Sequence, residues 1–419
     1  MAGDMLKVLA NSWPLLLGVM LLMVGNGVQS SLLGIRGALE GFTTFQLSVV
    51  MSAYYLGFLG GSQIAPEMIR RVGHVRVFAA LGSLISAVLV LYPLLLDWTA
   101  WSVMRVMIGF SFSVIYVTAE SWLNNTASNE TRGQALSAYM IVQMLGIIAA
   151  QGLLSVGDPG GFGLFIIPSV LVSLAFMPIL LADTPAPTFD QIRPMSFRML
   201  FKISPLGCVG MLLTGGIYSA MFGMSSVWGA LIGLTIGQIA AFVAAMYIGG
   251  LILQYPIGWI SDRVDRRVLV VWMSGIGAAV MLIATAFQLP FNFVLIVAVL
   301  LGGTINPLYS LLIAHTNDFL GKEDMAAASA GLIFLNGFGA IFGPLITGWL
   351  MGMVGPRGFF LFIGVLFAAL AGYSAWRMVR RTTPDGSSGY ADLSPSASSL
   401  AVGAVLELEP RRPRDVAAS

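Results

Sequence analysis

Charged residues are scarce in this chain. Only 10% of its 419 residues are Asp, Glu, Lys or Arg, whereas a soluble domain of ordinary composition carries about 25%. Hydrophobic residues make up 57% of the chain, and its mean hydropathy is +0.88. A soluble protein that exposed so much apolar surface would aggregate, so we expect an integral membrane protein.

Cysteine is almost absent, and so are the usual marks of an enzyme. The single cysteine, Cys208, excludes an internal disulfide and a cysteine-based metal site. The sequence has no His/Asp cluster, no nucleophile elbow, no phosphate loop and no paired acids. We therefore expect no enzymatic activity, no metal and no cofactor. The lack of a long basic block also argues against nucleic acid as a partner.

Apolar runs of about 20 residues divide the chain into twelve expected transmembrane helices. Runs of this length indicate helices rather than the alternating segments of a β-barrel. The first run continues past residue 30 without a clear cleavage site, so we expect a retained span there rather than a signal peptide. The expected spans are 12–35, 44–69, 76–96, 100–122, 133–156, 161–182, 206–229, 236–260, 267–287, 291–315, 325–352 and 356–378.

Lysine and arginine are unevenly distributed around these spans. With both termini inside, 18 of the 21 basic residues fall on the inner side. Basic residues concentrate on the cytoplasmic side of membrane proteins, so both termini are expected in the cytoplasm. We expect four regions: an N-terminal six-helix bundle at 1–182, a cytoplasmic linker at 183–205, a C-terminal six-helix bundle at 206–379, and a disordered tail at 380–419, which is rich in Ser, Pro and Ala.

The two halves match each other at an offset of 192 or 193 residues. Polar residues are rare in membrane spans, so matches of Tyr, Gln and Arg at one offset indicate an internal repeat. The matched pairs are Gly41/Gly233, Thr43/Thr235, Gln46/Gln238, Tyr55/Tyr247, Gly57/Gly249, Arg71/Arg263, Gly109/Gly302, Tyr116/Tyr309, Asn124/Asn317 and Gly146/Gly339. Six spans per repeat keep both halves in one orientation, which predicts a site between two pseudo-symmetric bundles near the membrane midplane.

Two motifs resemble those of the major facilitator superfamily. One lies between the eighth and ninth spans and reads Gly258-Trp-Ile-Ser-Asp262-Arg263-Val-Asp265-Arg266-Arg267, with Asp265 where the family usually has glycine. The other is Arg105-x-x-x-Gly109 in the fourth span. A Gly-Pro element usual in the fifth span is absent, and Gly343-Pro344 stands in the eleventh. The stretch "AESWLN" after the fourth span is similar to a poorly characterised bacterial branch of the family.

The resemblance implies the all-α major facilitator fold of twelve transmembrane helices and secondary active transport by alternating access. The implied transporter is a monomer in the bacterial inner membrane. We expect it to export a small organic or amphipathic solute as a proton-coupled antiporter, with membrane lipids as further partners. Tyrosines, amides and methionines within the spans suit such a solute better than a phosphate or a metal ion. The alternatives are a uniporter, a lipid flippase on the same fold, or a non-transporting membrane receptor.

Polar side chains within the spans are the candidates for substrate binding, because the family's cavity is lined by spans 1, 4, 7 and 10 and flanked by 2, 5, 8 and 11. The alternative is interhelical hydrogen bonding, worth roughly 0.6 kcal/mol per contact. For Arg105 the choice lies between binding an anionic substrate, modulating a nearby acid and donating to carbonyls of the first span. The candidates are Asn26, Gln29, Arg105, Tyr116, Tyr139, Gln143, Tyr218, Tyr247, Gln254, Asn306, Tyr309 and Asn336.

Charges near the inner ends of the spans are the candidates for gating or proton coupling. The resemblance implies that Asp262 faces the N-terminal end of the fifth span, where a helix dipole favours an anion, and so latches the cytoplasmic side. Glu120 either titrates or pairs with Arg71 or Arg76 as a gate. The alternative for the loop charges is a purely topogenic role. The candidates are Glu120, Arg71, Arg76, Asp262, Arg263 and Arg266.

Overall fold

The computed structural model describes residues 2–126, 132–181, 195–380, 386–387 and 412–413, and this part of the chain is almost wholly helical. Two short strands, β1 and β2, pair antiparallel. The elements are α1 Ala2–Leu39, α2 Thr44–Val72, α3 His74–Leu91, α4 Trp98–Thr126, α5 Arg132–Val156, α6 Gly163–Ala175, α7 Met177–Leu181, α8 Phe197–Ile203, α9 Pro205–Leu231, α10 Ile236–Ser261, α11 Arg266–Ala286, α12 Phe291–Asn317, α13 Lys322–Val354, α14 Gly358–Arg380, β1 Gly386–Ser387 and β2 Arg412–Pro413.

The all-α prediction is confirmed, and the twelve expected spans correspond to α1 to α6 and α9 to α14. In the described residues, eleven helices are long and apolar enough to cross a membrane. The twelfth, α2, has 29 residues but a lower hydropathy, because it carries serines, two tyrosines and a charged inner end. The short α7 continues α6. The third span ends at Leu91, earlier than expected.

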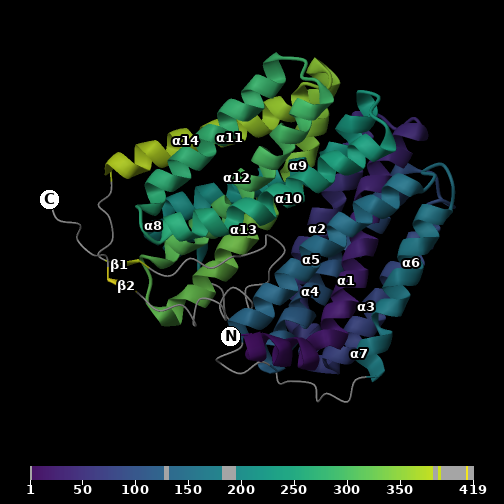
Figure 1. Cartoon of the computed structure of the whole chain (residues 1–419), viewed down its shortest axis with the longest axis horizontal. Helices are drawn as coiled ribbons and strands as arrows, with labels where there is room; N and C mark the ends of the chain where they lie inside the picture. Colours follow the sequence, from purple (N-terminus) through teal and green to yellow (C-terminus); the bar gives the residue numbers. More distant parts are fainter. Residues whose placement is uncertain (1, 127–131, 182–194, 381–385, 388–411, 414–419) are drawn as a thin grey trace.

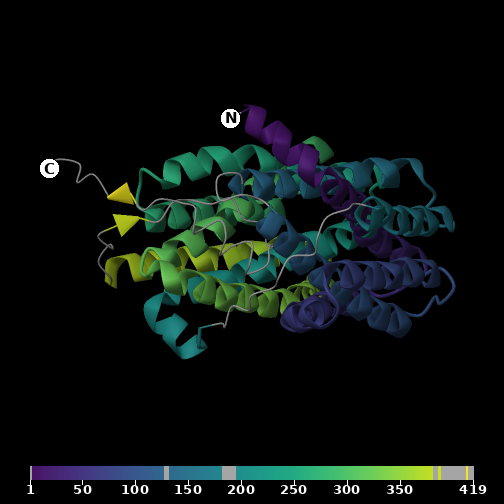
Figure 2. The ribbon, with the colours of Figure 1, turned by 90° about the horizontal axis from the view of Figure 1, so that it is seen from below.

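Figure 1 shows two groups of helices, α1 to α7 and α9 to α14, and Figure 2 shows the same groups side by side from below. Within the groups, α2 packs on α4 as α10 packs on α12, and α1 packs on α5 as α9 packs on α13. The expected linker 183–205 contains the helix α8, and its residues before 195 lie outside the described part. Of the tail predicted to be disordered, only Arg380, β1 and β2 are described.

The repeat seen in the sequence is also a repeat of local structure. Thr43 and Gln46 form a capping box that starts α2, and Thr235 and Gln238 form the same box at α10. The preceding Gly41 and Gly233 have φ of 78° and 76°, a backbone conformation that favours glycine. The matched residues therefore build matched helix starts.

Asp97 starts α4, the helix that carries Arg105 and Glu120. Its carboxylate accepts the backbone N–H groups of Thr99 and Ala100, each at 2.9 Å. These two bonds satisfy backbone donors that the helix itself leaves free, and the Thr99 hydroxyl donates a further bond to the same carboxylate. The Thr99 hydroxyl, followed by the Ala100 N–H, lowers the pKa of Asp97 below its ordinary value.

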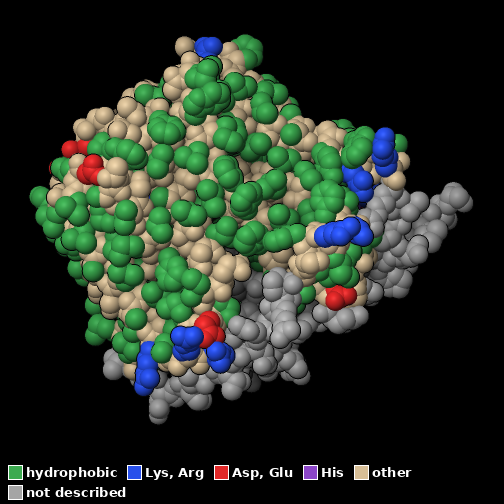
Figure 3. Space-filling view, turned by 180° about the vertical axis from the view of Figure 1, so that it is seen from behind, with side chains coloured by type: hydrophobic (Ala, Val, Ile, Leu, Met, Phe, Trp, Pro, Cys, Tyr) green, Lys and Arg blue, Asp and Glu red, His purple; other side chains and the backbone are tan. Residues whose placement is uncertain are grey.

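Figure 3 shows a face covered by hydrophobic side chains, with charged side chains near its margins. Large apolar side chains such as Val103, Trp272 and Phe293 are exposed along the helices. Bare hydrocarbon of this extent suits lipid and not water. The chain is thus a multi-pass membrane protein.

The two bundles make close contacts near the helix ends expected to face outward. A Cβ added to Gly34 of α1 would overlap the Ser226 hydroxyl of α9, and one added to Gly348 of α13 would overlap Ser48 of α2. Ser52 of α2 donates a hydrogen bond to the Ile341 carbonyl of α13. The bundles are therefore joined tightly at this end.

Candidate functional site

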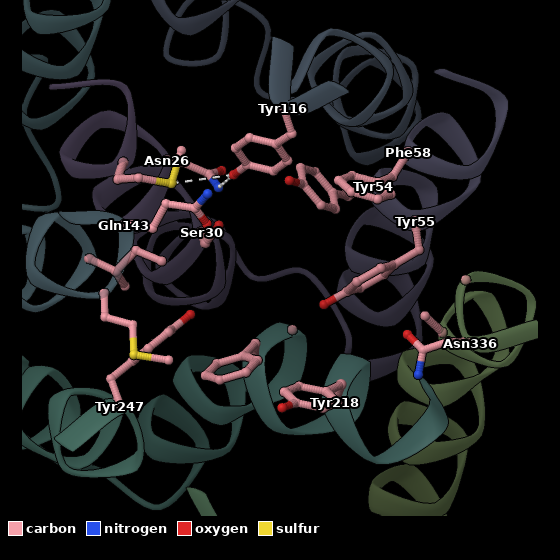
Figure 4. A pocket seen from close by; sticks show the side chains of 18 of the residues that line it. Asn26, Ser30, Tyr54, Tyr55, Phe58, Tyr116, Gln143, Tyr218, Tyr247 and Asn336 are labelled. Atoms are coloured by element: carbon pink, nitrogen blue, oxygen red, sulfur yellow. Dashed lines mark hydrogen bonds between the residues drawn. The ribbon is translucent and has the colours of Figure 1, made fainter. Parts of the chain in front are cut away.

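A cavity of about 180 Å³ lies between the two bundles. Helices α1, α2, α4 and α5 line it on one side and α9, α10, α12 and α13 on the other. Figure 4 shows tyrosines from both bundles around the open space, with Tyr54 and Tyr55 across from Tyr218 and Tyr247. Its walls thus combine aromatic rings, amides and methionines.

Eight of the twelve candidate binding residues line this cavity: Asn26, Arg105, Tyr116, Gln143, Tyr218, Tyr247, Asn306 and Asn336. They come from seven different helices, so no single helix builds the site. The sequence pattern therefore selected residues that the fold brings together. Their role in binding a solute stays a prediction.

The other four candidates are buried, but the structure does not bring them to the cavity wall. Gln29 turns toward α3 and donates to the Tyr92 hydroxyl at 3.2 Å. Tyr139, Gln254 and Tyr309 each lie one or two helical turns nearer the expected inner end than the lining residues Gln143, Tyr247 and Asn306. Met140, the neighbour of Tyr139, does line the cavity, so these two side chains differ in the face of α5 that they occupy.

Several lining residues escaped the sequence analysis, among them Tyr54, Phe58, Gln151 and Phe222. The available signal was the tyrosine pair Tyr54-Tyr55 within an otherwise apolar span. The internal repeat singles out Tyr55, which matches Tyr247, but it says nothing about Tyr54. The flanking helix α2 contributes as much of the wall as the lining helices do.

Hydrogen bonds within each bundle fix the amides of the wall. In the N-terminal bundle, Asn26 Nδ2 donates to the Tyr116 hydroxyl at 3.3 Å. In the C-terminal bundle, the Tyr218 hydroxyl donates to Asn306 Oδ1 at 2.6 Å, and Asn306 Nδ2 donates to the Gly302 carbonyl at 2.9 Å. Asn336 Nδ2 donates to the Met211 carbonyl at 3.1 Å. These hydrogen bonds hold the polar side chains of the wall in place.

Arg105 is the one charged residue among the described residues that line the cavity. It is only 3% exposed. Its guanidinium lies 4.7 Å from the centre of the Tyr54 ring, and Nη2 lies 3.7 Å from the Met51 sulfur. The atoms Nε and Nη1 are buried without a hydrogen-bond partner.

Glu120 is fully buried on α4. Its carboxylate lies within electrostatic range of Tyr139 on α5 and of Tyr309 from the other bundle. The predicted ion pairs of Glu120 with Arg71 or Arg76 are not formed in this structure. Arg71 pairs with Glu67 at the exposed end of α2, and Arg76 is exposed to the outside of the bundle. Arg71 pairs with Glu67 because the two residues are one helical turn apart on the same helix face, whereas Glu120 is buried on another helix.

The charged turn between α10 and α11 joins helices of one bundle. Arg266 is 1% exposed and binds Asp318, the residue after α12, at 2.6 Å, with Asp262 further away at 3.7 Å. Arg263 instead stacks on the Trp259 ring at 3.8 Å. The predicted contact of Asp262 with the start of α5 involves side chains outside the described residues and stays a prediction.

The part of the chain that the structure describes has no group of three His, Cys, Asp or Glu side chains placed to hold a metal ion. What the site offers is neutral hydrogen-bonding groups, aromatic faces and one buried cation. These suit reversible binding of a solute that reaches both bundles at once.

The sequence model of the Major Facilitator Superfamily matches the chain twice, at residues 15–243 and 206–412. The chain belongs to this superfamily. Curated relatives within the superfamily include the uncharacterized MFS-type transporter YcaD of Escherichia fergusonii. It is 24% identical over 342 residues, which are 80% of this chain and 88% of the relative. An uncharacterized MFS-type transporter of Yersinia pestis is 25% identical over 362 residues, which are 85% and 93% of the two chains.

Solved structures of major facilitator transporters share the fold. The nucleoside transporter NupG has a TM-score of 0.73 at 13% identity, covering 88% of this chain and 99% of that one. A bacterial homolog of the human lysosomal transporter Spinster, in an inward-facing and occupied conformation, has a TM-score of 0.68 at 13% identity, covering 88% and 98%. At such low identity the likeness extends to the architecture alone.

Proposed function

We propose that this protein is a secondary active transporter that moves a small organic or amphipathic solute by alternating access. The observation that carries the proposal is the cavity between the bundles, whose walls come from both halves of the repeat. A rocking motion of one bundle against the other changes the access to such a site from one side to the other. The contacts at the outer helix ends would then belong to a state closed to the outside.

We place the protein in the bacterial inner membrane with both termini in the cytoplasm, and we propose proton-coupled export. The orientation rests on the distribution of Lys and Arg. Proton coupling rests on Glu120, a carboxyl group that is fully buried on α4 and can exchange a proton. The 1–182 and 206–379 regions are the two moving bundles, and residues near Asp262, Arg263 and Arg266 would stabilise the inner face.

Transport is tested by flux into proteoliposomes that contain the purified full-length protein. A thermal-shift screen against metabolites and drugs first identifies a solute that binds. Counterflow of this solute is then measured with the wild type and with Tyr218→Ala and Asn306→Ala, which break the bond between the two side chains. We expect counterflow in the wild type and its loss in both variants. Binding without any flux would point instead to the receptor.

Proton coupling predicts a specific behaviour of Glu120→Gln. The glutamine keeps the shape of the side chain but cannot carry a proton, so uphill transport driven by a pH gradient should fall by about tenfold or more. Counterflow, which needs no net proton movement, should persist in the same vesicles. The matched control is Glu67→Gln on the exposed end of α2. Equal pH-driven flux in Glu120→Gln and the wild type would assign the proton to another group, and a wild type without any pH-driven uphill flux would favour the uniporter.

A further inference from the structure

The buried guanidinium of Arg105 is the feature of the cavity that the fold itself leaves unexplained. An arginine in the membrane interior is costly unless it is paired or hydrated, and it does not escape the cost by losing its proton. Yet two of its three nitrogens, Nε and Nη1, have no hydrogen-bond partner in the described residues. The Tyr54 ring and the Met51 sulfur offer it only weak contacts.

No acid of the described residues neutralises Arg105. Glu120 lies on the same helix but fifteen residues further on, about 22 Å along the helix axis. Asp97 accepts backbone N–H groups at the start of the helix, on the outer side. The described lining of the cavity therefore carries one positive charge and no negative charge.

Resting on the proposed function, we propose that the solute is a small organic monoanion whose carboxylate binds Arg105. Hydrogen bonds between a guanidinium and a carboxylate are among the strong ones, and a carboxylate at one edge of the guanidinium would satisfy one of the two free nitrogens. A single cation matches a single negative charge, so a carboxylate fits better than a phosphate dianion. The solute completes a charge pair that the chain leaves open.

The rest of the cavity fits a flat apolar body attached to this carboxylate. Phe222 and Tyr247 stack with ring centres 4.6 Å apart, and Tyr54 and Tyr55 lie edge to face with ring centres 5.4 Å apart. Figure 4 shows Tyr54 and Tyr55 across the space from Tyr247. Aromatic walls of this kind favour an aromatic guest. Asn26 Oδ1, which is buried without a partner, can accept a hydrogen bond from an N–H or O–H group of the solute.

The test compares acids with their neutral amides by calorimetric titration of the purified full-length protein. The pairs are benzoate and benzamide, phenylacetate and phenylacetamide, and indole-3-acetate and indole-3-acetamide. The two members of each pair have the same ring, and only the acid carries the negative charge that Arg105 would bind. We expect at least one acid to bind the wild type about 10- to 100-fold more tightly than its amide.

Variants assign this preference to Arg105. In Arg105→Gln the preference for the acid should disappear while binding of the amide remains, and Arg105→Lys should keep part of it. The matched control is Arg357→Gln, which removes the same charge from an exposed outer turn and should leave the preference unchanged. The comparison of acid and amide in the wild type tests the proposal even if Arg105→Gln fails to fold.

Two outcomes would overturn the proposal: amides that bind the wild type as well as the acids do, or an acid preference that survives in Arg105→Gln. The outcome for transport is separate. If an acid binds through Arg105 but never crosses the membrane, the proposed transport function is contradicted and the proposed anion site is supported. If neutral solutes are transported equally well by the wild type and Arg105→Gln, the transport function is supported and the anion site is contradicted.

Discussion

Replacing Asp318 with alanine is expected to cause a large loss of thermal stability. Asp318 and Arg266 are 2% and 1% exposed, and their charged groups lie 2.6 Å apart. Removal of one partner from a buried ion pair costs about 3–5 kcal/mol, because the other charge stays buried. The alternative contact of Arg266 with Asp262, at 3.7 Å, is too long to replace the lost bond.

The pair ties the start of α11 to the inner end of α12. Arg266 Nη1 also donates to the Ala314 carbonyl at 3.3 Å, so the guanidinium bridges the side chain and the backbone of α12. Loss of the aspartate should therefore loosen this end of the C-terminal bundle as well as lower its stability. Asp318→Asn keeps an acceptor oxygen and should fall between the wild type and Asp318→Ala.

The measurement is thermal unfolding of the purified variants in one detergent, followed by intrinsic fluorescence. The control is Glu67→Ala, which breaks the exposed pairs of Glu67 with Arg70 and Arg71 at the end of α2. Exposed pairs contribute little, so its unfolding temperature should stay close to that of the wild type. Equal unfolding temperatures for Asp318→Ala and Glu67→Ala would show that the buried pair does not hold the bundle together.

The partner of Arg266 shows where sequence reasoning ends. The two residues lie 52 positions apart, and nothing in their spacing selects Asp318 over Asp262, which is four residues from Arg266. The apolar spans, in contrast, were predictable because each needs about 20 residues whatever its neighbours are. The helix starts at Thr43 and Thr235 were also predictable, because a capping box involves only residues three positions apart.

The rotation of each helix about its axis limited the prediction of the site. Apolar side chains cover these helices on nearly all sides, so periodicity does not say which face meets the cavity and which meets lipid. Tyr54 and Tyr55 of α2 both reach the cavity, whereas Gln29 of α1, three residues from Asn26, turns away to Tyr92. Selecting polar residues within the spans identified eight residues that line the cavity. Only the packing of the helices distinguishes these eight from the four candidates that lie elsewhere.

Gly302→Ala is expected to disrupt the C-terminal bundle, because α12 and α10 touch there backbone to backbone. A Cβ at Gly302 would overlap the Met246 carbonyl, and one at the facing Gly249 would overlap the Val299 carbonyl. A backbone atom cannot rotate away, so the helices must separate, at about 1–3 kcal/mol or more. The repeat predicts the same for Gly109→Ala, whose Cβ would overlap the Tyr54 carbonyl of α2.

The control for both variants is Gly275→Ala on α11, where an added Cβ meets nothing within 4 Å. Since alanine is the better helix former, this variant should be as stable as the wild type or slightly more so. Thermal unfolding of the three proteins in one detergent makes the comparison. Gly302→Ala should also lower solute affinity, because the Gly302 carbonyl holds the Asn306 amide, which in turn holds the Tyr218 hydroxyl. If Gly302→Ala unfolds at the same temperature as Gly275→Ala, the close contact of α10 with α12 does not determine the stability of the bundle, and the matched glycines of the two halves lose their structural meaning.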